Sequence, residues 1–183
     1  MRLEAPAPPV RLDIGAAALP RQGRFLVQHL VRGNLNDRHE LAALVVSDGS
    51  GAIPVAAAAL APLLGNVLNG TSKNVPGIAD TLVAACKNVT STAAIAVIWN
   101  GEVSMDGVGG CPIYHHSGGR LTRLRRGALK LAVRDWLVLA CAAPFDEATL
   151  QREIAAVRSS AVELAQRLAA QVGNGPVVVV YGY

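Results

Sequence analysis

The sequence predicts an α+β domain in which mostly antiparallel strands are kept apart from the helices. Short apolar runs of strand length recur along the chain, and glycine-rich turns separate several of them. The helical segments do not alternate regularly with these runs, which argues against repeated βαβ units. Of the 183 residues, 51% are apolar and only 16% are charged, so the composition excludes an intrinsically disordered chain.

The first half of the chain is expected to contain two strands followed by two helices. Residues 1–22 hold four prolines and little periodicity, so we expect a loose lead-in before a single domain at 23–183. The second strand is a continuous apolar run that ends in Asp48 and a glycine-rich turn, as a strand buried on both faces would. Pro62 is expected to interrupt the first helix. The predicted strands are 25–31 and 41–46, and the predicted helices are 55–68 and 80–88.

The second half is expected to contain a run of hairpin strands, one long helix and a last strand. Asn100-Gly101 is a hairpin signal. The long helix has apolar residues at helical spacing, Asp146 as its N-cap and Gly173 where a C-terminal cap belongs. The predicted strands are 93–99, 103–108, 112–116, 121–124, 136–141 and 177–181, and the predicted helix is 147–171.

The composition also argues against some classes of binding partner and against a membrane-spanning segment. A net charge of +4 and 4% aromatic residues argue against a nucleic-acid partner. No apolar run reaches the length of about 20 residues that crosses a bilayer. The three cysteines are widely spaced and predict buried thiols, and we expect a cytoplasmic protein. The oligomeric state stays open.

The most informative local feature is Asp48, which follows a buried strand and precedes Gly49. A carboxylate in this place is held rigidly at the edge of a sheet, where it can meet a cation or a bound water. Taken alone, such a residue more often bonds to its own turn.

Several segments together resemble the type 2C metal-dependent serine/threonine protein phosphatases, the PPM superfamily. The resemblance runs in order over about residues 24–181, and the turn at 48–56 is similar to the sporulation and stress-response branch. The segments that carry it are 32–37 with Asp48-Gly49, 91–94, 108–114, 131–141 and 177–180.

The resemblance implies a central sandwich of two antiparallel β-sheets flanked by helices. In active members, two Mg²⁺ or Mn²⁺ ions at one edge of the sandwich activate water for attack on a phosphoserine or phosphothreonine. Such hard cations take oxygen ligands and lower the pKa of bound water.

Carried over residue by residue, the resemblance makes Arg32 the phosphate-contacting arginine. Asp48 and Asp37 match metal-binding acids, and Gly49 matches the glycine that offers its carbonyl. Other positions depart from the pattern, because neutral residues stand where the family has metal-binding acids. These replaced positions are Asn36, Ala142 and Gly173.

Two functions follow, and we prefer the first. A domain that has lost most of its metal acids is expected to act as a regulatory, protein-binding pseudophosphatase in bacterial phospho-signalling, with no cofactor or with weakly bound Mg²⁺ or Mn²⁺. The alternative is an active phosphoserine/phosphothreonine phosphatase with a reconfigured site, recruiting Asp106 or Asp135. A third interpretation is a subunit of a larger assembly.

The partner is expected to be a protein, with a phosphorylated segment as one candidate, rather than nucleic acid or membrane. A dense basic cluster offers a docking surface for it, because guanidinium groups bind carboxylate and phosphate oxygens. The alternative is that these arginines are simply the solvent-exposed residues of a strand and turn, which needs no functional explanation. Its candidate residues are Arg120, Arg123, Arg125 and Arg126.

Overall fold

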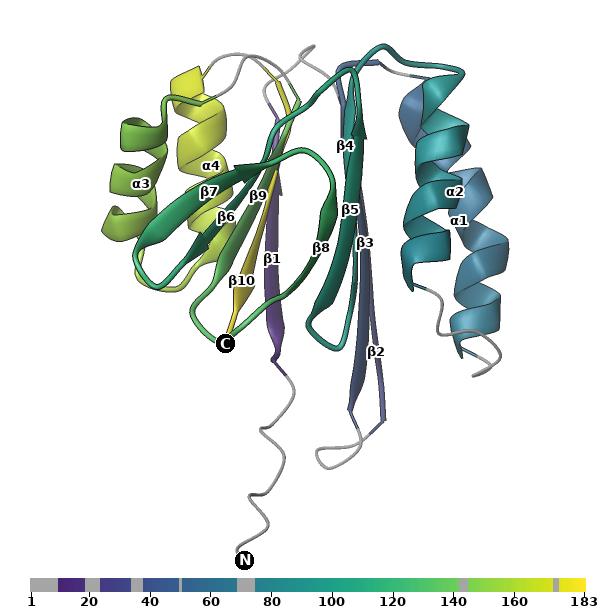
Figure 1. Cartoon of the computed structure of the whole chain (residues 1–183), viewed down its shortest axis with the longest axis horizontal. Helices are drawn as coiled ribbons and strands as arrows, with labels where there is room; N and C mark the ends of the chain where they lie inside the picture. Colours follow the sequence, from purple (N-terminus) through teal and green to yellow (C-terminus); the bar gives the residue numbers. More distant parts are fainter. Residues whose placement is uncertain are drawn as a thin grey trace, which may run out of the picture.

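The computed structural model describes residues 10–18, 24–33, 38–49, 51–68, 75–141, 145–172 and 175–183. Two five-stranded antiparallel sheets pack face to face, and a pair of helices covers each outer side (Figure 1). This arrangement confirms the predicted α+β sandwich. Within the described ranges, no helix is both long and apolar enough to cross a membrane.

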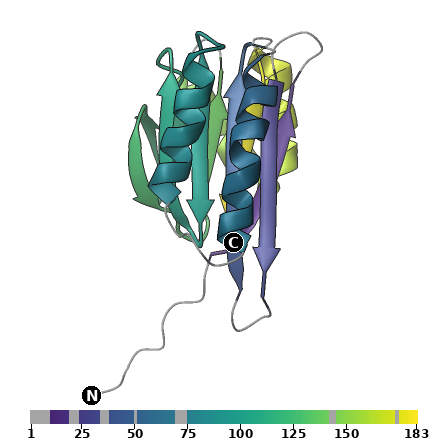
Figure 2. The same cartoon turned by 90° about the vertical axis from the view of Figure 1, so that its right-hand side faces the viewer.

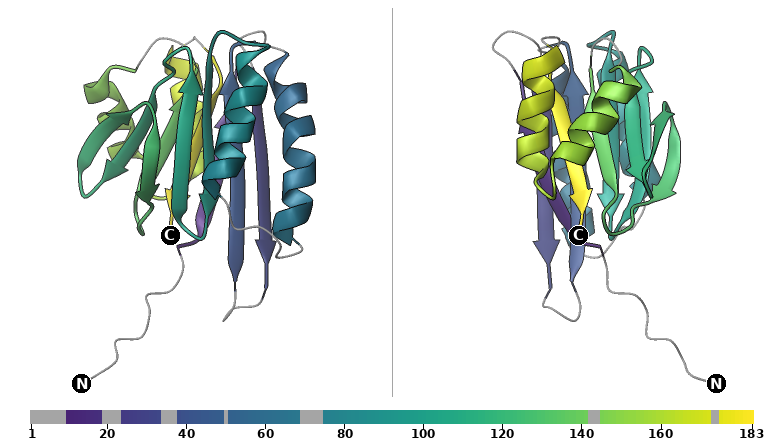
Figure 3. Two further views of the ribbon diagram at one scale, coloured as in Figure 1. Left: turned by 45° about the vertical axis from the view of Figure 1, so that its right-hand side comes forward. Right: turned by 90° about the vertical axis from the view of Figure 1, so that its left-hand side faces the viewer.

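The first sheet has the strand order β1-β10-β9-β6-β7. Two helices pack on its outer face, α3 (Glu147–Ala156) and α4 (Ala161–Val172), as the right-hand view of Figure 3 shows. In that order, its strands are Leu12–Ala17, Val177–Gly182, Trp136–Ala140, Ile113–Ser117 and Arg120–Leu124.

The second sheet has the order β2-β3-β4-β5-β8. Its outer face is covered by α1 (Ala52–Leu68) and α2 (Val75–Lys87), which lie along the strands in Figure 2. In that order, its strands are Arg24–Arg32, His39–Ser47, Ala93–Trp99, Glu102–Val108 and Gly127–Lys130.

Strands β3 and β4 of the second sheet are buried on both faces. Successive side chains on a strand point to opposite faces. On β3, Ala42, Leu44 and Val46 therefore pack into the sandwich interior, and the residues between them pack under α1 and α2. A strand with apolar contacts on both sides needs a continuous apolar run, which is what residues 41–46 provide. The core thus fixes the end of β3 and, with it, the position of Asp48.

The sequence predicted that residues 12–17 belong to a loose lead-in. The structure corrects this prediction, because these residues form the strand β1. This strand pairs with β10 along its whole length. The Asp13 carboxylate accepts a hydrogen bond of 2.8 Å from the Ala161 N–H at the start of α4. Gly15 lies directly against the same helix end, where an added Cβ would stand 2.2 Å from the Ala161 carbonyl oxygen. The strand is therefore specified by contacts that lie about 150 residues away in sequence.

The predicted helix 147–171 is two helices rather than one. After α3, Val157 adopts an extended conformation with φ −100° and ψ 124°. The Ser160 hydroxyl then accepts a hydrogen bond from the Glu163 N–H and begins α4. The apolar periodicity runs through both helices because Ile154, Val157 and Ala161 are all buried against the sheet.

The other departures are smaller. Helix α1 starts at Ala52 and runs through Pro62 without a break, and α2 starts five residues earlier than expected, with Pro76 in its first turn, where proline is tolerated. Strand β8 was not predicted. The Asn100-Gly101 hairpin is confirmed, since both residues have the positive φ values, 49° and 83°, that such a turn requires.

We expect Gly15→Ala to destabilise the protein by about 2–3 kcal/mol, because the new methyl group would collide with backbone rather than with a mobile side chain. Gly65→Ala is the matched control: it lies inside α1 with open space around it, so it should raise stability by about 0.5–1 kcal/mol. Urea unfolding monitored by circular dichroism measures both. Equal effects of the two substitutions would contradict the packing of β1 on α4.

We also expect the attachment of α3 to α4 to weaken in acid. Hydrogen bonds from Gln171 and Arg167 hold the pKa of Glu153 below its usual value, at distances of 2.6 and 2.7 Å. A carboxylate with a lowered pKa in the folded state stabilises it above the unfolded-state pKa, and the stabilisation is lost as the pH falls below about 4.3. Glu153→Gln should therefore lower the free energy of unfolding at pH 7 and make little difference at pH 3. A difference that is the same at both pH values would contradict this account.

Candidate functional site

The end of β3 is held by a network of hydroxyl groups. Ser47 is fully buried, and its hydroxyl donates to the Thr92 carbonyl at 2.9 Å and accepts from the Gly49 N–H at 3.0 Å. It also lies 3.1 Å from the Thr90 hydroxyl. The network ties the turn after β3 to the segment that leads into β4. Sequence reasoning missed this anchor, because Ser47 and Thr90 are far apart in the chain and belong to no motif.

Asp48 lies on this anchored turn with its carboxylate exposed to solvent. The Thr90 hydroxyl donates to its Oδ1 at 3.1 Å. An added Cβ at the next residue, Gly49, would meet the Thr90 hydroxyl at 2.8 Å, so this position favours glycine. The Gly49 carbonyl, expected by resemblance to serve a metal ion, accepts the Ala52 N–H at the start of α1 at 3.3 Å.

Uncharged hydroxyls and thiols lie next to Asp48. Two buried thiols, Cys111 and Cys141, lie beside it with their sulfur atoms 3.1 Å apart. Within the described part of the chain, no three His, Cys, Asp or Glu side chains are grouped so that they could hold a metal ion. In the sequence, the undescribed residues 50, 142–144 and 173–174 include no acidic residue.

The structure does not bring Arg32 together with Asp48. In the β2–β3 hairpin, Arg32 pairs with His39, whereas Ser47, the neighbour of Asp48, pairs with Arg24. Eight residues of strand separate the two ends, or about 26 Å. Arg32 therefore does not share a phosphate site with Asp48. The residue that the register places at the Asp48 edge is Arg24, an exposed cation that sequence reasoning overlooked.

Four of the positions singled out by resemblance lie outside the described residues: Asn36, Asp37, Ala142 and Gly173. The first two fall between Gly33 and Arg38, so the residues flanking them belong to the hairpin end that holds Arg32. Their roles stay predictions.

Asp106 and Asp135, the two acids that a reconfigured site was expected to recruit, form hydrogen bonds or ion pairs with groups other than Asp48. Asp106 lies 3.5 Å from the Arg126 guanidinium and accepts the Gly107 N–H at 2.7 Å. Asp135 is buried just before β9, at the strand end opposite Cys141, and accepts from Ala132 N–H and from His115. The structure therefore does not join either acid to Asp48.

The basic cluster lies on β7 and the turn that follows it. Arg120, Arg123 and Arg125 are exposed, and no described residue forms an ion pair with them. Arg126 is 75% exposed despite its contact with Asp106. Since Ile113 pairs with Leu124, the end of β7 lies near Cys111 and hence toward the Asp48 edge. The structure thus separates this cluster from Arg32, which lies on β2 at the opposite margin of the sandwich (Figure 1).

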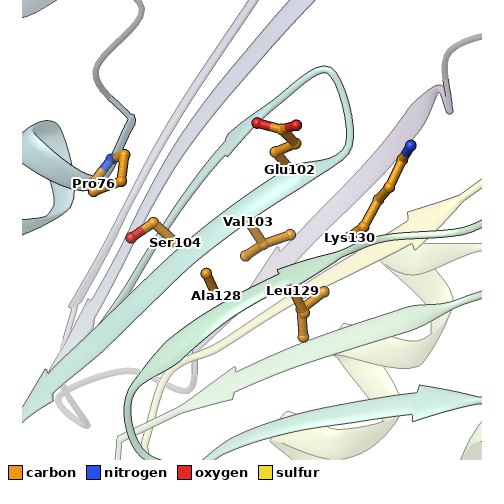
Figure 4. A pocket seen from close by; sticks show the side chains of 7 residues that line it. All are labelled: Pro76, Glu102, Val103, Ser104, Ala128, Leu129 and Lys130. Atoms are coloured by element: carbon orange, nitrogen blue, oxygen red, sulfur yellow. The ribbon is translucent and has the colours of Figure 1, made fainter.

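A pocket of about 300 Å³ lies elsewhere, between the start of α2 and the paired strands β5 and β8. Pro76 faces it from the helix, and Glu102 and Lys130 stand at one end of it (Figure 4). Glu102 begins β5, whereas the Asp48 edge meets the end of that strand. The pocket is therefore separate from the candidate site.

The donor set at the Asp48 edge does not fit a two-metal centre. Mg²⁺ and Mn²⁺ favour carboxylate and carbonyl oxygens. Among the described residues, Asp48 belongs to no group of three or more potential metal ligands, and the groups that it contacts or that lie beside it are a hydroxyl and two thiols. We therefore derive no reaction step through a metal pair in this chain.

Comparison with solved structures places the fold. The chain is similar to the phosphatase domain of SpoIIE from Bacillus subtilis solved with a fragment of its regulatory domain, with a TM-score of 0.61 and 16% identity. The match covers 94% of this chain but only 64% of the SpoIIE chain. No family model matches the sequence, and no curated protein matches it.

Two complete bacterial phosphatase domains are also similar. The catalytic domain of the serine/threonine phosphatase PstP, solved with two manganese ions, has a TM-score of 0.57 and 16% identity over 94% of this chain and 99% of its own. The serine/threonine phosphatase of S. agalactiae has a TM-score of 0.57 and 12% identity over 93% and 99%. The chain therefore has the type 2C phosphatase fold, which is the resemblance that the sequence indicated.

We expect the hydroxyl anchor and the exposed carboxylate to differ in their effect on stability. Ser47→Ala should cost about 1–3 kcal/mol, because it removes the hydrogen bonds of a fully buried hydroxyl and takes away the acceptor of the Gly49 N–H. Asp48→Asn should change stability by no more than about 0.5 kcal/mol, because the side chain is exposed. Thermal and urea unfolding of the two variants provide the measurement. A larger loss for Asp48→Asn would show that this residue serves the fold.

Proposed function

We propose that the chain is a phosphatase-like regulatory domain that binds a protein partner and does not hydrolyse phosphoesters with a metal pair. One observation carries this proposal: in the part of the chain that the structure describes, Asp48 belongs to no group of three or more side chains that could hold a metal ion, and its neighbours include hydroxyls, thiols and Arg24.

Charge is the physical reason. Each divalent ion must exchange part of its hydration shell for protein oxygens, and Mg²⁺ dehydrates reluctantly. A single carboxylate leaves two such ions with three uncompensated positive charges in one small volume. Arg24 at the same edge adds a further positive charge. One weakly bound Mg²⁺ or Mn²⁺ at Asp48 is compatible with this charge count, since one or two carboxylates often suffice for Mg²⁺.

The partner that fits best is an acidic or phosphorylated protein segment. Exposed arginines on β7 and its following turn present several guanidinium groups toward solvent. Guanidinium pairs with phosphate and carboxylate in a bidentate manner, which gives orientation as well as affinity. A nucleic acid is less favoured, because few aromatic residues are available to stack on bases.

We also propose that the chain acts in bacterial signalling in the cytoplasm. Three free, buried cysteines are compatible with a reducing compartment. The chains of similar fold include serine/threonine phosphatases of bacteria.

Calorimetric titration of the full chain with Mn²⁺ should show no tight two-ion binding, and the protein should not turn over p-nitrophenyl phosphate. Restoring acids with the double substitution Ala142→Asp and Gly173→Asp should raise Mn²⁺ affinity at least about tenfold if lost charge is the cause.

The matched control is Asn36→Asp, which adds a negative charge between Gly33 and Arg38, two described residues that flank the end of the β2–β3 hairpin opposite to Asp48. It should leave Mn²⁺ affinity unchanged. Mn²⁺-dependent turnover by the unmodified chain, abolished in Asp48→Asn, would instead establish the alternative, an active phosphatase with a reconfigured site.

Charge reversal of the docking surface provides a second test. The double substitution Arg123→Glu and Arg125→Glu should weaken binding to an acidic phosphopeptide pool at least about tenfold, measured by fluorescence anisotropy at fixed ionic strength. Arg158→Glu and Arg152→Glu on and after α3 make the same charge change on another exposed surface and should have little effect. Equal losses in both double variants would mean that only net charge matters.

A further inference from the structure

Cys111 and Cys141 face each other across two neighbouring strands. Ile113 on β6 pairs with Leu139 on β9, so two residues further out the same register sets Cys111 opposite Cys141. The Ala140 N–H donates to the Pro112 carbonyl at 3.4 Å, which shows that the pairing extends past the ends of both strands. Directly opposed residues on antiparallel strands have Cα atoms about 4.5–5.5 Å apart, within the range that a disulfide spans.

The two sulfur atoms already touch. They lie 3.1 Å apart in the interior of the sandwich, where Cys111 is 4% exposed and Cys141 is 1% exposed. The third cysteine, Cys86, lies in a different apolar cluster under α1 and α2. The chain therefore holds one preformed pair of thiols and one isolated thiol.

We propose that Cys111 and Cys141 form a peroxide-sensitive dithiol that closes to a reversible disulfide beside Asp48. The oxidant is hydrogen peroxide, which is close to water in size and needs only a small opening to reach a buried sulfur. This inference uses no metal and no partner, so it stands apart from the proposed function.

The reaction balances in two steps. One of the two sulfurs attacks one peroxide oxygen, the O–O bond breaks, and the products are a sulfenic acid at that cysteine and one water. The other sulfur then attacks the sulfenic acid sulfur, forms the S–S bond and displaces the hydroxyl, which leaves as a second water with the thiol proton. Two thiols and one peroxide thus become one disulfide and two waters. A low-molecular-weight thiol reverses the change by exchange.

Closure would tie the beginning of β6 to the end of β9 at the candidate site. Cys111 also lies near the turn of the docking surface, since the space over Gly107 is bordered by the backbone carbonyls of Cys111 and Arg125. Oxidation of the Cys111–Cys141 pair would therefore constrain the segment that joins the Asp48 edge to the basic cluster.

The test treats the folded, full-length chain with a slight excess of hydrogen peroxide and measures its intact mass. The remaining thiols are then blocked after denaturation for a thiol count and a peptide map. We expect a product lighter by two hydrogen atoms, a fall from three free thiols to one, and a single Cys111–Cys141 peptide. A reducing thiol should restore the starting mass. Cys86→Ser should behave like the parent, whereas Cys111→Ser and Cys141→Ser should not lose two hydrogens.

A urea-unfolded sample gives the comparison that separates geometry from general reactivity. The folded protein should form the disulfide at least about tenfold faster at equal peroxide, because its sulfurs are held together. A pair that reacts only after unfolding, a disulfide that includes Cys86, or oxidation beyond the disulfide to sulfinic acid would each overturn the proposal. Because the main readout is on the unmodified protein, it does not depend on whether a variant folds.

Discussion

Two divalent cations remain side by side in a protein only where several anionic oxygens balance their mutual repulsion and replace the water that they lose. This electrostatic requirement governs how the fold of this chain relates to its chemistry. The structure anchors Asp48 firmly through Ser47 and Thr90, and among the described residues hydroxyls and thiols lie next to that carboxylate, with Arg24 at the same edge. The position of Asp48 is fixed, but within the described ranges no group of three or more potential metal ligands gathers there.

The fold does not depend on that charge. Its stability comes from three apolar layers, one between the sheets and one beneath each pair of helices. The layer between the sheets and the layer beneath α1 and α2 both continue to the end of β3. Because the packing is independent of the metal acids, a sandwich of this kind can lose them and keep its shape. The same framework can then present an exposed surface, such as the arginines on and after β7, to a partner.

The sequence predicted those helices, strands and turns whose own residues form a recognisable local pattern. Residues 41–46 and 93–99 are continuous apolar runs, and Asn100-Gly101 has the side chains that its turn needs. Strand β1 escaped prediction because its partners, β10 and the start of α4, are remote in sequence. The division of the last helix was encoded by Ser160 and Glu163, but the unbroken apolar periodicity obscured it.

The candidate site was predicted less completely than the fold. Asp48 could be found because a buried strand ends beside it. Arg32 was assigned by its order in the chain, and only the register of the β2–β3 hairpin shows that it lies at the far end. The Cys111–Cys141 contact had no sequence signal, since the residues are widely spaced and only strand pairing brings them together.

The most direct test of the account is a crystal of the full chain soaked in manganese chloride and measured for anomalous scattering next to Asp48. We predict at most one partly occupied ion bound to that carboxylate. Two fully occupied manganese ions bridged by Asp48 would contradict the central claim, because they would show that other oxygens supply the charge that this edge lacks.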